Sequence, residues 1–248
     1  MSNRYILTYA AILVTIVAAI LSATSMLLKP YQQRNITIEK MQNILLAAGH
    51  DEVTRHNAET LFKTHCVSLL TIDADGHIID NVTAEDPTQS RAFNINAKES
   101  LYNRSEGRPF FLPIFLIENQ GRILTVIPLQ GNGLWGPIWG YLALEEDLNT
   151  IAGVVFDHKS ETPGLGAEIT SPAFQTQFTG KVLFDEGRFT PLRVKKGGII
   201  TLPPKEHSHA VDAISGGTIT SNGVEIMLND ILNAYLPYLR NKQHVNKK

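Results

Sequence analysis

The strongest hydrophobic pattern of the chain lies close to its N-terminus. The run from Tyr5 to Leu28 includes no charged side chain and is rich in Ile, Leu, Val and Ala. A helix needs roughly 20 apolar residues to cross a bilayer, so this run predicts one transmembrane helix over about residues 5–28. A cleaved signal peptide is the alternative, but the run is longer than a typical signal core and residues 22–25 show no convincing small-residue cleavage site. We therefore expect an uncleaved membrane anchor over residues 1–34 and a separate domain over residues 35–248.

Beyond the anchor, the pattern predicts a mixture of one-sided helices and short strands. Residues 36–48 carry apolar side chains mostly on one helical face and end at Gly49, a residue typical of helix C-termini. Polar residues 51–64 are compatible with a solvated helix. Two stretches, 67–80 and 112–129, each contain two apolar runs around a short turn, which predicts two antiparallel strand pairs.

The remaining segments lack a strong period except near the C-terminus. Residues 80–96 and 97–108 are polar and aperiodic, so we expect a surface loop followed by a polar connection. Apolar side chains recur at three- and four-residue spacing over residues 224–235, which predicts an amphipathic helix that begins near Asn222 and ends at Pro237. Strands and helices do not alternate regularly. We therefore predict an α+β fold, in which one transmembrane helix precedes a mixed, largely antiparallel sheet domain.

Composition narrows the classes of function. A chain of 248 residues with 43% hydrophobic residues can bury a full core, and the net charge of −2 indicates no nucleic-acid-binding surface. The single cysteine, Cys66, excludes an internal disulfide and cysteine-rich metal clusters. His50, His56 and His65 lie near one another in the sequence, but no carboxylate or cysteine accompanies them at ligand spacing, so we predict no metal site.

The stretch that differs from these patterns runs from Asp212 to Gly223 and reads D-A-I-S-G-G-T-I-T-S-N-G. It combines hydroxyl side chains with two adjacent glycines, Gly216 and Gly217, just before the predicted helix. Unpaired backbone N–H groups at a helix N-terminus favour an anion, and glycines let it approach closely, so a phosphate is the natural ligand. An ordinary N-cap turn has the same composition and is the alternative from this stretch alone.

Within that stretch, S-G-G-T at Ser215 to Thr218 resembles the S-G-A-T flavinylation motif, and Asp212 matches the acidic residue upstream of it. Three further segments follow in the order expected for the same family: G-L-W at 133–135, F-D-H-K at 156–159 and E-T-P-G-L-G-A-E-I at 161–169. With the anchor, they resemble the NqrC family, a component of the sodium-translocating NADH:quinone reductase, over most of the chain. Gly217 stands where that family usually has Ala, a sterically mild difference.

The resemblance implies a covalent flavin. In that family the last Thr of the motif, Thr218 here, carries FMN through a phosphoester, which would make the chain a flavoprotein and a phosphoprotein. The other residues implied at the cofactor are Ser215, Gly216 and Gly217 near the phosphate, and Trp135, Glu161, Thr162, Leu165 and Gly166 near the ring. Gly164 and Gly166 would let backbone N–H groups approach the ring, and the charge of Glu161 would disfavour anionic reduced forms. From its own residues, Glu161 is equally compatible with a plain surface carboxylate.

The same resemblance implies a role and a location. The chain would be the electron-carrier subunit of a six-subunit complex in the bacterial inner membrane, with residues 35–248 as an FMN-binding domain on the periplasmic side. A separate Mg-dependent flavin transferase would attach the FMN. Another subunit would oxidise NADH, because no nucleotide-binding glycine fingerprint follows a strand here. The charges beside the anchor, Arg4 on one side and Lys29 and Arg34 on the other, instead predict a cytoplasmic domain.

Three other functions are alternatives. The homologous RnfG family of the ion-pumping ferredoxin:NAD oxidoreductase shares the S-G-A-T motif, although residues 156–166 match the NqrC family more fully. A membrane-anchored sensor or ligand-binding module would have a similar anchor and domain but no cofactor. A hydrolase that uses Ser215 or Thr218 would need a G-x-S-x-G elbow or an ordered set of Ser, acid and His, and the sequence offers neither. We therefore interpret Thr218 as an attachment point and predict no catalytic residue.

Overall fold

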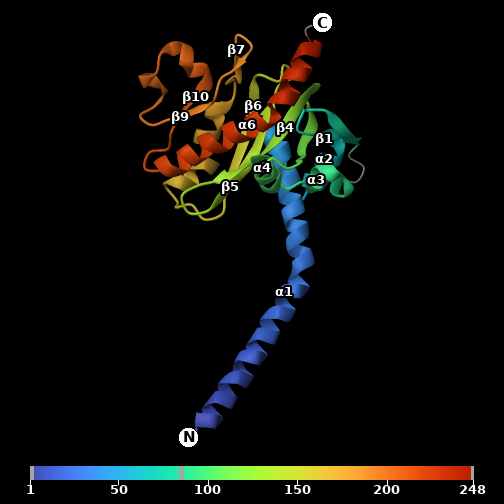
Figure 1. The fold of residues 1–248 in the computed structure, drawn as a ribbon, viewed down its shortest axis with the longest axis vertical. Helices are drawn as coiled ribbons and strands as arrows, with labels where there is room; N and C mark the ends of the chain where they lie inside the picture. The colour runs from blue at the N-terminus through green and yellow to red at the C-terminus, as the bar shows by residue number, and fades with distance from the viewer. Residues whose placement is uncertain (1–2, 84–86, 247–248) are drawn as a thin grey trace. The chain divides into compact units, whose positions relative to one another are not determined.

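The chain separates into two compact units, residues 1–40 and 41–248 (Figure 1). The computed structural model describes residues 3–83 and 87–246. The first unit belongs to α1, a helix that runs from Asn3 to Ala47, so the two helices predicted at residues 5–28 and 36–48 are one. Pro30 lies inside α1. A proline removes only one backbone hydrogen bond, and good helix formers on both sides continue the helix past it.

The N-terminal part of α1 has the properties of a membrane span. Its side chains are exposed along residues 3–36, and the helix is long and apolar enough to cross a bilayer by length and composition. The hydroxyls of Thr8, Thr15 and Thr24 each donate to the carbonyl oxygen four residues earlier, at 2.9, 2.8 and 2.8 Å. In a bilayer, such bonds would satisfy hydroxyl groups that otherwise face lipid. The prediction of one N-terminal apolar helix is confirmed.

The second unit is built on a six-stranded sheet in the order β2-β1-β3-β4-β5-β6, in which every neighbouring pair is antiparallel. The strands are β1 (Cys66–Ile72), β2 (Ile78–Val82), β3 (Leu112–Asn119), β4 (Arg122–Asn132), β5 (Pro137–Leu144) and β6 (Ile151–His158). Both predicted strand pairs are present, as the hairpins β1–β2 and β3–β4. The predicted α+β fold with a largely antiparallel sheet is therefore confirmed.

One face of the sheet is covered by the C-terminal helix α6 (Thr218–Asn246), drawn in red in Figure 1. Its apolar side chains recur at helical spacing and join one buried cluster with side chains of the sheet. Tyr235 is fully buried in this cluster, and its hydroxyl donates to the carbonyl oxygen of Pro113 at 2.6 Å. Burial raises the pKa of the Tyr235 hydroxyl well above its usual range.

The sequence predicts that α6 ends at Pro237, and this prediction is wrong, because the helix continues to Asn246. Tyr238 and Leu239, directly after the proline, are buried in the same cluster as Tyr235. The free energy gained by burying these two side chains offsets the loss of the backbone hydrogen bond that Pro237 cannot donate. The turn after β1 also lies against the helix here, since a Cβ atom at Gly76 would collide with the backbone of Tyr238. Tertiary packing therefore overrides the local effect of the proline.

The opposite face of the sheet is covered by α2 (Ala58–His65) and α3 (Arg91–Asn94), which pack on β1 and β3. Phe62, Phe93 and Phe115 form an edge-to-face series with ring centroids 6.0 and 6.4 Å apart. α2 is shorter than the helix predicted over residues 51–64. The backbone N–H of Thr54 donates to the side-chain oxygen of Asn57 at 2.6 Å, and this polar turn occupies the residues before the helix.

The segment predicted as a polar connection contains a helix, α4 (Ala97–Ser105). Asn96 caps it, because its side-chain oxygen accepts from the backbone N–H groups of Lys98 and Glu99 at 3.0 and 3.4 Å. The helix has too few apolar residues to show a helical period, so hydrophobic pattern alone does not reveal it. Leu101 attaches it to the buried cluster under α6.

After β6, the chain forms mainly short elements before it reaches α6. Helical turns are η2 (Gly166–Thr170), α5 (Pro172–Gln175), η3 (Thr176–Phe178), η4 (Ile199–Thr201) and η5 (Pro204–His209), and η1 (Pro87–Gln89) lies earlier in the chain. Strands β7 (Phe184–Asp185) and β8 (Arg188–Phe189) pair antiparallel, and β9 (Arg193–Lys195) pairs with β10 (Ala210–Asp212) in parallel. β10 leads directly into the glycine-rich stretch before α6.

Candidate functional site

A pocket of about 380 Å³ lies at the N-terminal end of α6. Three segments that are far apart in the sequence form it: the loop before β5, the loop after β6 and the first turn of α6. It is lined by Leu134, Trp135, Glu161, Thr162, Leu165, Gly166, Gly216, Gly217, Thr218, Ile219 and Thr220. The structure thus brings together all the residues implied at a cofactor except Ser215, which is exposed in the adjoining turn.

The glycine pair shapes the turn that starts α6. The backbone N–H of Gly217 donates to the carbonyl oxygen of Ile214 at 3.1 Å, and Gly216 between them has a φ of 75°, which glycine adopts without strain. The N–H of Ser221 then donates to the carbonyl oxygen of Gly217 at 2.9 Å, the first hydrogen bond of the helix. α6 therefore begins at Thr218 and not near Asn222, as the apolar period predicts.

Starting the helix at Thr218 changes which groups face the pocket. The backbone N–H groups of the first helical turn have no partner within the helix, and here they belong to Thr218, Ile219 and Thr220. Thr218 is the first residue of α6, so its side chain lies at the same helix end as these donors. The residue is also exposed. The arrangement combines hydrogen-bond donors, the positive end of the helix dipole and an accessible hydroxyl.

Glu161 connects the three segments of the pocket. One carboxylate oxygen accepts from the backbone N–H of Trp135 at 2.8 Å, and the other accepts from the hydroxyl of Thr220 at 2.6 Å. The residue is only 5% exposed, so its interpretation as a plain surface carboxylate is wrong. Its charge is held by two hydrogen bonds within the protein.

Two glycines make room for this carboxylate. A Cβ atom at Gly133 would collide with one oxygen of Glu161, and a Cβ atom at Gly166 would collide with the other oxygen and with the hydroxyl of Thr220. The approach of a flavin ring to Gly166, which the resemblance implies, stays a prediction. In the structure, the side chain that lies against both glycines is that of Glu161.

The walls of the pocket expose large apolar side chains. Trp135 is 65% exposed, and Leu134, Leu165 and Ile219 are also exposed. The Trp135 backbone is held at two points. Its N–H donates to Glu161 at 2.8 Å, and its carbonyl oxygen accepts from the Ser160 hydroxyl at 3.0 Å. Exposed apolar groups around a pocket with a few polar donors are typical of a site for an aromatic ligand.

The surroundings of Gly164 differ from the expectation that its N–H approaches a flavin ring. This N–H donates to the carboxylate of Glu168 at 3.0 Å, so it is already paired. Gly164 has a φ of 74°, which places a bend at the tip of the loop. The role of Gly164 here is to shape the loop that carries Leu165 and Gly166.

Asp212, the acidic residue upstream of the motif, does not line the pocket. Its carboxylate accepts from the backbone N–H of Ile199 at 2.7 Å, and its own N–H donates to the side chain of Gln177 at 2.8 Å. Asp212 therefore holds the turn before η4 against the end of β10. Its contribution to the pocket is indirect, through the position of the chain that enters α6.

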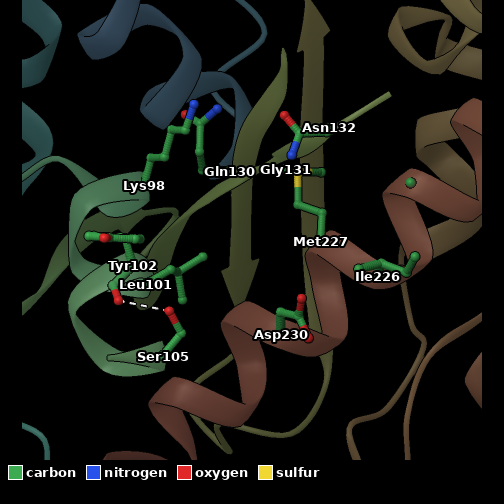
Figure 2. A pocket seen from close by; sticks show the side chains of 11 residues that line it. Lys98, Leu101, Tyr102, Ser105, Gln130, Gly131, Asn132, Ile226, Met227 and Asp230 are labelled. Atoms are coloured by element: carbon green, nitrogen blue, oxygen red, sulfur yellow. Dashed lines mark hydrogen bonds between the residues drawn. The ribbon is translucent and has the colours of Figure 1, made fainter. Parts of the chain in front are cut away.

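A second pocket of about 430 Å³ lies further along α6, between α4 and β4 (Figure 2). Met227 of α6 fills the space above Gly131 of β4, where a Cβ atom would lie 2.7 Å from the Met227 Cβ. Lys98 and Tyr102 of α4 and Asp230 of α6 also line it. None of the residues implied at a cofactor lines this pocket, so we place the candidate site at the N-terminal end of α6.

Comparison with protein families identifies the part of the chain that contains the site. The FMN-binding domain family matches residues 133–233. That range includes every segment that lines the pocket at the start of α6.

Several relatives are similar over nearly the whole chain. The NqrC component of the Na(+)-translocating NADH-quinone reductase of Vibrio vulnificus (strain YJ016) is 33% identical over 215 residues, which cover 83% of this chain and 81% of the relative. The same component from Pseudomonas aeruginosa is 32% identical over 248 residues, which cover 93% of this chain and 94% of the relative.

Solved structures show the same likeness. The crystal structure of the NqrC component of the Na(+)-translocating NADH-quinone reductase from Parabacteroides distasonis superposes with a TM-score of 0.70 at 33% identity, covering 86% of this chain and 96% of that chain. The crystal structure of Shewanella oneidensis NqrC gives a TM-score of 0.64 at 27% identity, covering 84% of this chain and 98% of that chain.

Proposed function

Because this chain belongs to the NqrC family of the Na(+)-translocating NADH-quinone reductase and contains an FMN-binding domain, we propose that it carries electrons through an FMN attached covalently to Thr218. One observation carries the attachment: Thr218 is the first residue of α6, so its exposed hydroxyl lies at the helix end where unpaired N–H groups lie. A phosphoester at this hydroxyl would place the phosphate at that end of the helix. We propose no catalytic residue in this chain.

The first turn of α6 supports the phosphate. N–H groups and the positive end of the helix dipole stabilise a phosphate without a charged side chain. Gly216 exposes the backbone of the turn, and Ser215 presents a further hydroxyl beside it. The attachment to Thr218 keeps the cofactor at the site where free FMN would be scarce.

The walls of the pocket support the flavin ring. Trp135 and Leu165 offer exposed apolar surface, and Glu161, Thr162 and Gly166 complete the pocket between them. When bound, FMN supplies the redox chemistry, and the residues of this chain supply position and environment. Because both oxygens of Glu161 are hydrogen-bonded within the protein, its proposed effect is to fix the Trp135 loop against α6.

We further propose how the chain works within its complex. Residues 1–34 anchor it in the inner membrane, and residues 35–248 form the FMN-binding domain on the periplasmic side. Its partners are the other subunits of a six-subunit complex, one of which oxidises NADH. A Mg-dependent flavin transferase attaches the FMN, which agrees with an exposed Thr218 that a second protein can reach.

The attachment is tested by flavin fluorescence in a denaturing gel. Wild type, Thr218→Ala and Ser215→Ala are produced in a host that contains the flavin transferase. Only a covalent flavin survives denaturation, so we expect a fluorescent band for wild type and Ser215→Ala and none for Thr218→Ala. Ser215→Ala is the matched control, because it removes the neighbouring exposed hydroxyl of the same turn.

Two results would contradict the attachment. Loss of the band in Ser215→Ala with retention in Thr218→Ala would move the attachment to Ser215. A missing band in wild type, when a control protein is flavinylated in the same cells, would favour a cofactor-free sensor module. The relatives named above are NqrC proteins, which favours this complex over the ferredoxin:NAD oxidoreductase with its RnfG component.

A further inference from the structure

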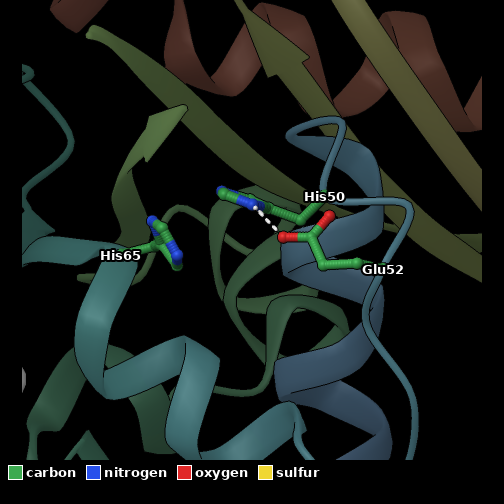
Figure 3. Close-up of side chains that lie close together, drawn as sticks. All are labelled: His50, Glu52 and His65. Carbon is green, nitrogen blue, oxygen red and sulfur yellow. Dashed lines mark hydrogen bonds and ion pairs between the residues drawn. The ribbon is translucent and has the colours of Figure 1, made fainter. Parts of the chain in front are cut away.

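Three side chains that are distant from the pocket at α6 converge where α1 leads into the domain (Figure 3). His50 follows α1, Glu52 lies two residues later, and His65 is the last residue of α2. One ligand atom from each lies within 4.8 Å of the other two. Sequence spacing predicts no metal site here, because it does not show that His65 and Glu118 of β3 lie beside His50 and Glu52.

The hydrogen bonds of His50 determine which ring nitrogen carries a proton. Its Nε2 lies 2.9 Å from the backbone carbonyl oxygen of Glu118. A carbonyl oxygen can only accept, so Nε2 is the donor and, in the neutral ring, Nδ1 carries a lone pair. That Nδ1 faces a carboxylate oxygen of Glu52 at 3.0 Å. Two acceptors at this distance need a hydrogen atom or a metal ion between them.

The two rings and the carboxylate are arranged around a common point. The His50 side chain is only 4% exposed, so the packing around it fixes the direction of its Nδ1. The ring of His65 lies against it, with centroids 4.3 Å apart. A bound cation would satisfy the lone pair of His50 and the carboxylate of Glu52 together.

Glu118 provides the surrounding support that metal-binding histidines usually have. Its backbone carbonyl orients His50, and its carboxylate lies 3.1 Å from Nδ1 of His65. Ligating histidines commonly have such a carbonyl or carboxylate partner, which fixes the ring and its tautomer. The carboxylate of Glu118 is itself held by the N–H of Gly121 at 2.7 Å.

We propose that His50, Glu52 and His65 bind a divalent transition-metal ion, for which Zn²⁺ is the best match. Two imidazole nitrogens and one carboxylate oxygen are a ligand set that zinc uses, with a water in the fourth position. Zinc bonds of about 2.0–2.1 Å place tetrahedral ligands roughly 3.4 Å apart, which this cluster reaches with small side-chain movements. The two carboxylates balance the charge of the ion.

The ion would join three elements that the chain connects only distantly. It would tie the segment after α1 to the end of α2, and through Glu118 to β3. Such a link stabilises the folded state by the free energy of metal binding, because the unfolded chain does not hold the ligands together. This proposal is independent of the flavin at α6.

The test uses the untagged full-length chain in detergent, as purified from the cells, freed of metal with a chelator and titrated with Zn²⁺ by calorimetry. We expect one ion at this cluster, and a loss of affinity of at least about tenfold for Glu52→Gln and for His65→Gln. His56→Gln is the matched control, because His56 is exposed and outside the cluster, and it should bind Zn²⁺ as wild type does.

A second control tests whether the ion binds at another group of side chains instead. Asp73, Asp75 and His77 also lie close together, but Asp73 accepts from the backbone N–H groups of Asp75 and His77, so it already holds a turn. Binding lost in His77→Gln instead would place the ion there and overturn the proposal. Absence of Zn²⁺ binding to wild type, or equal affinity in Glu52→Gln and His65→Gln, would also overturn it.

Thermal unfolding distinguishes metal binding from a folding defect. With Zn²⁺ in excess, the unfolding midpoint of wild type and His56→Gln should rise, and that of Glu52→Gln and His65→Gln should not. Midpoints without metal show whether each variant is folded. An equal rise in all four proteins would mean that the ion binds elsewhere, which would contradict the assignment.

Discussion

At the scale of single residues, Glu161 shows how one side chain can organise a pocket. Its two carboxylate oxygens bind the Trp135 loop and the first turn of α6, and Gly133 and Gly166 leave the space that it fills. A buried carboxylate is stable only when it is hydrogen-bonded. The stability of the pocket should therefore depend on this residue more than on the exposed groups around it.

We expect Glu161→Ala to lower the free energy of unfolding by about 2–4 kcal/mol, because it leaves the Trp135 N–H and the Thr220 hydroxyl without their charged partner. Glu161→Gln is the matched control and should cost only about 1 kcal/mol, since an amide can accept one bond and donate the other. Urea unfolding followed by tryptophan fluorescence measures both. Equal losses in the two variants would show that the charge, and not the hydrogen bonding, is required.

At the scale of elements, the turn from Ile214 to Gly217 decides where α6 begins. The two glycines in it have different roles. Gly216 has a φ of 75° and a Cβ atom there would lie 2.6 Å from Leu165 Cδ2. At Gly217 a Cβ atom would lie 3.0 Å from Ile214 Cγ2 and 3.1 Å from the Leu165 carbonyl oxygen, contacts that require these neighbours to move by a few tenths of an ångström.

We expect Gly216→Ala to lower the unfolding midpoint by about 3–6 °C and to reduce flavin incorporation, because an alanine in the left-handed region costs about 1–2 kcal/mol. Gly217→Ala restores the residue usual in the S-G-A-T motif and should change the midpoint by less than about 2 °C with flavin retained. Differential scanning calorimetry and in-gel fluorescence measure the two effects. A larger loss for Gly217→Ala than for Gly216→Ala would contradict these roles.

At the scale of the whole molecule, a labelling experiment tests on which side of the membrane the large domain lies. Charges beside the anchor and the family resemblance predict opposite sides. Cys66, the single cysteine, offers a clean background for a labelling test. It is 5% exposed, and burial raises the pKa of its thiol to about 12, so it should not react at neutral pH.

We expect Ile200→Cys to react with a membrane-impermeant maleimide in cells whose outer membrane is permeabilised, because Ile200 is 85% exposed in the large domain. Asn3→Cys, at the start of α1, should react only after the inner membrane is also disrupted. Wild type serves as the control and should remain unlabelled. The reverse pattern would place the domain in the cytoplasm, as the flanking charges predict.

Local sequence patterns were sufficient to predict the N-terminal apolar helix, the strand pairs and the family. The helix and the hairpins follow from runs of apolar residues, whose period depends only on neighbouring positions. The family followed from short motifs, and the relatives at 33% and 32% identity confirm it. The same motifs also named the residues that line the pocket at α6.

The sequence by itself therefore determined the N-terminal apolar helix, the α+β class and the segments that form the candidate site. Tertiary structure alone decided what depends on contacts between distant residues. It carries α6 past Pro237 by burying Tyr238 and Leu239. It also pairs Glu161 with Thr220, and it brings His50 and His65 to one point. The reason is physical: periodicity records which side of an element is buried, whereas a hydrogen bond or a shared ion depends on which elements meet.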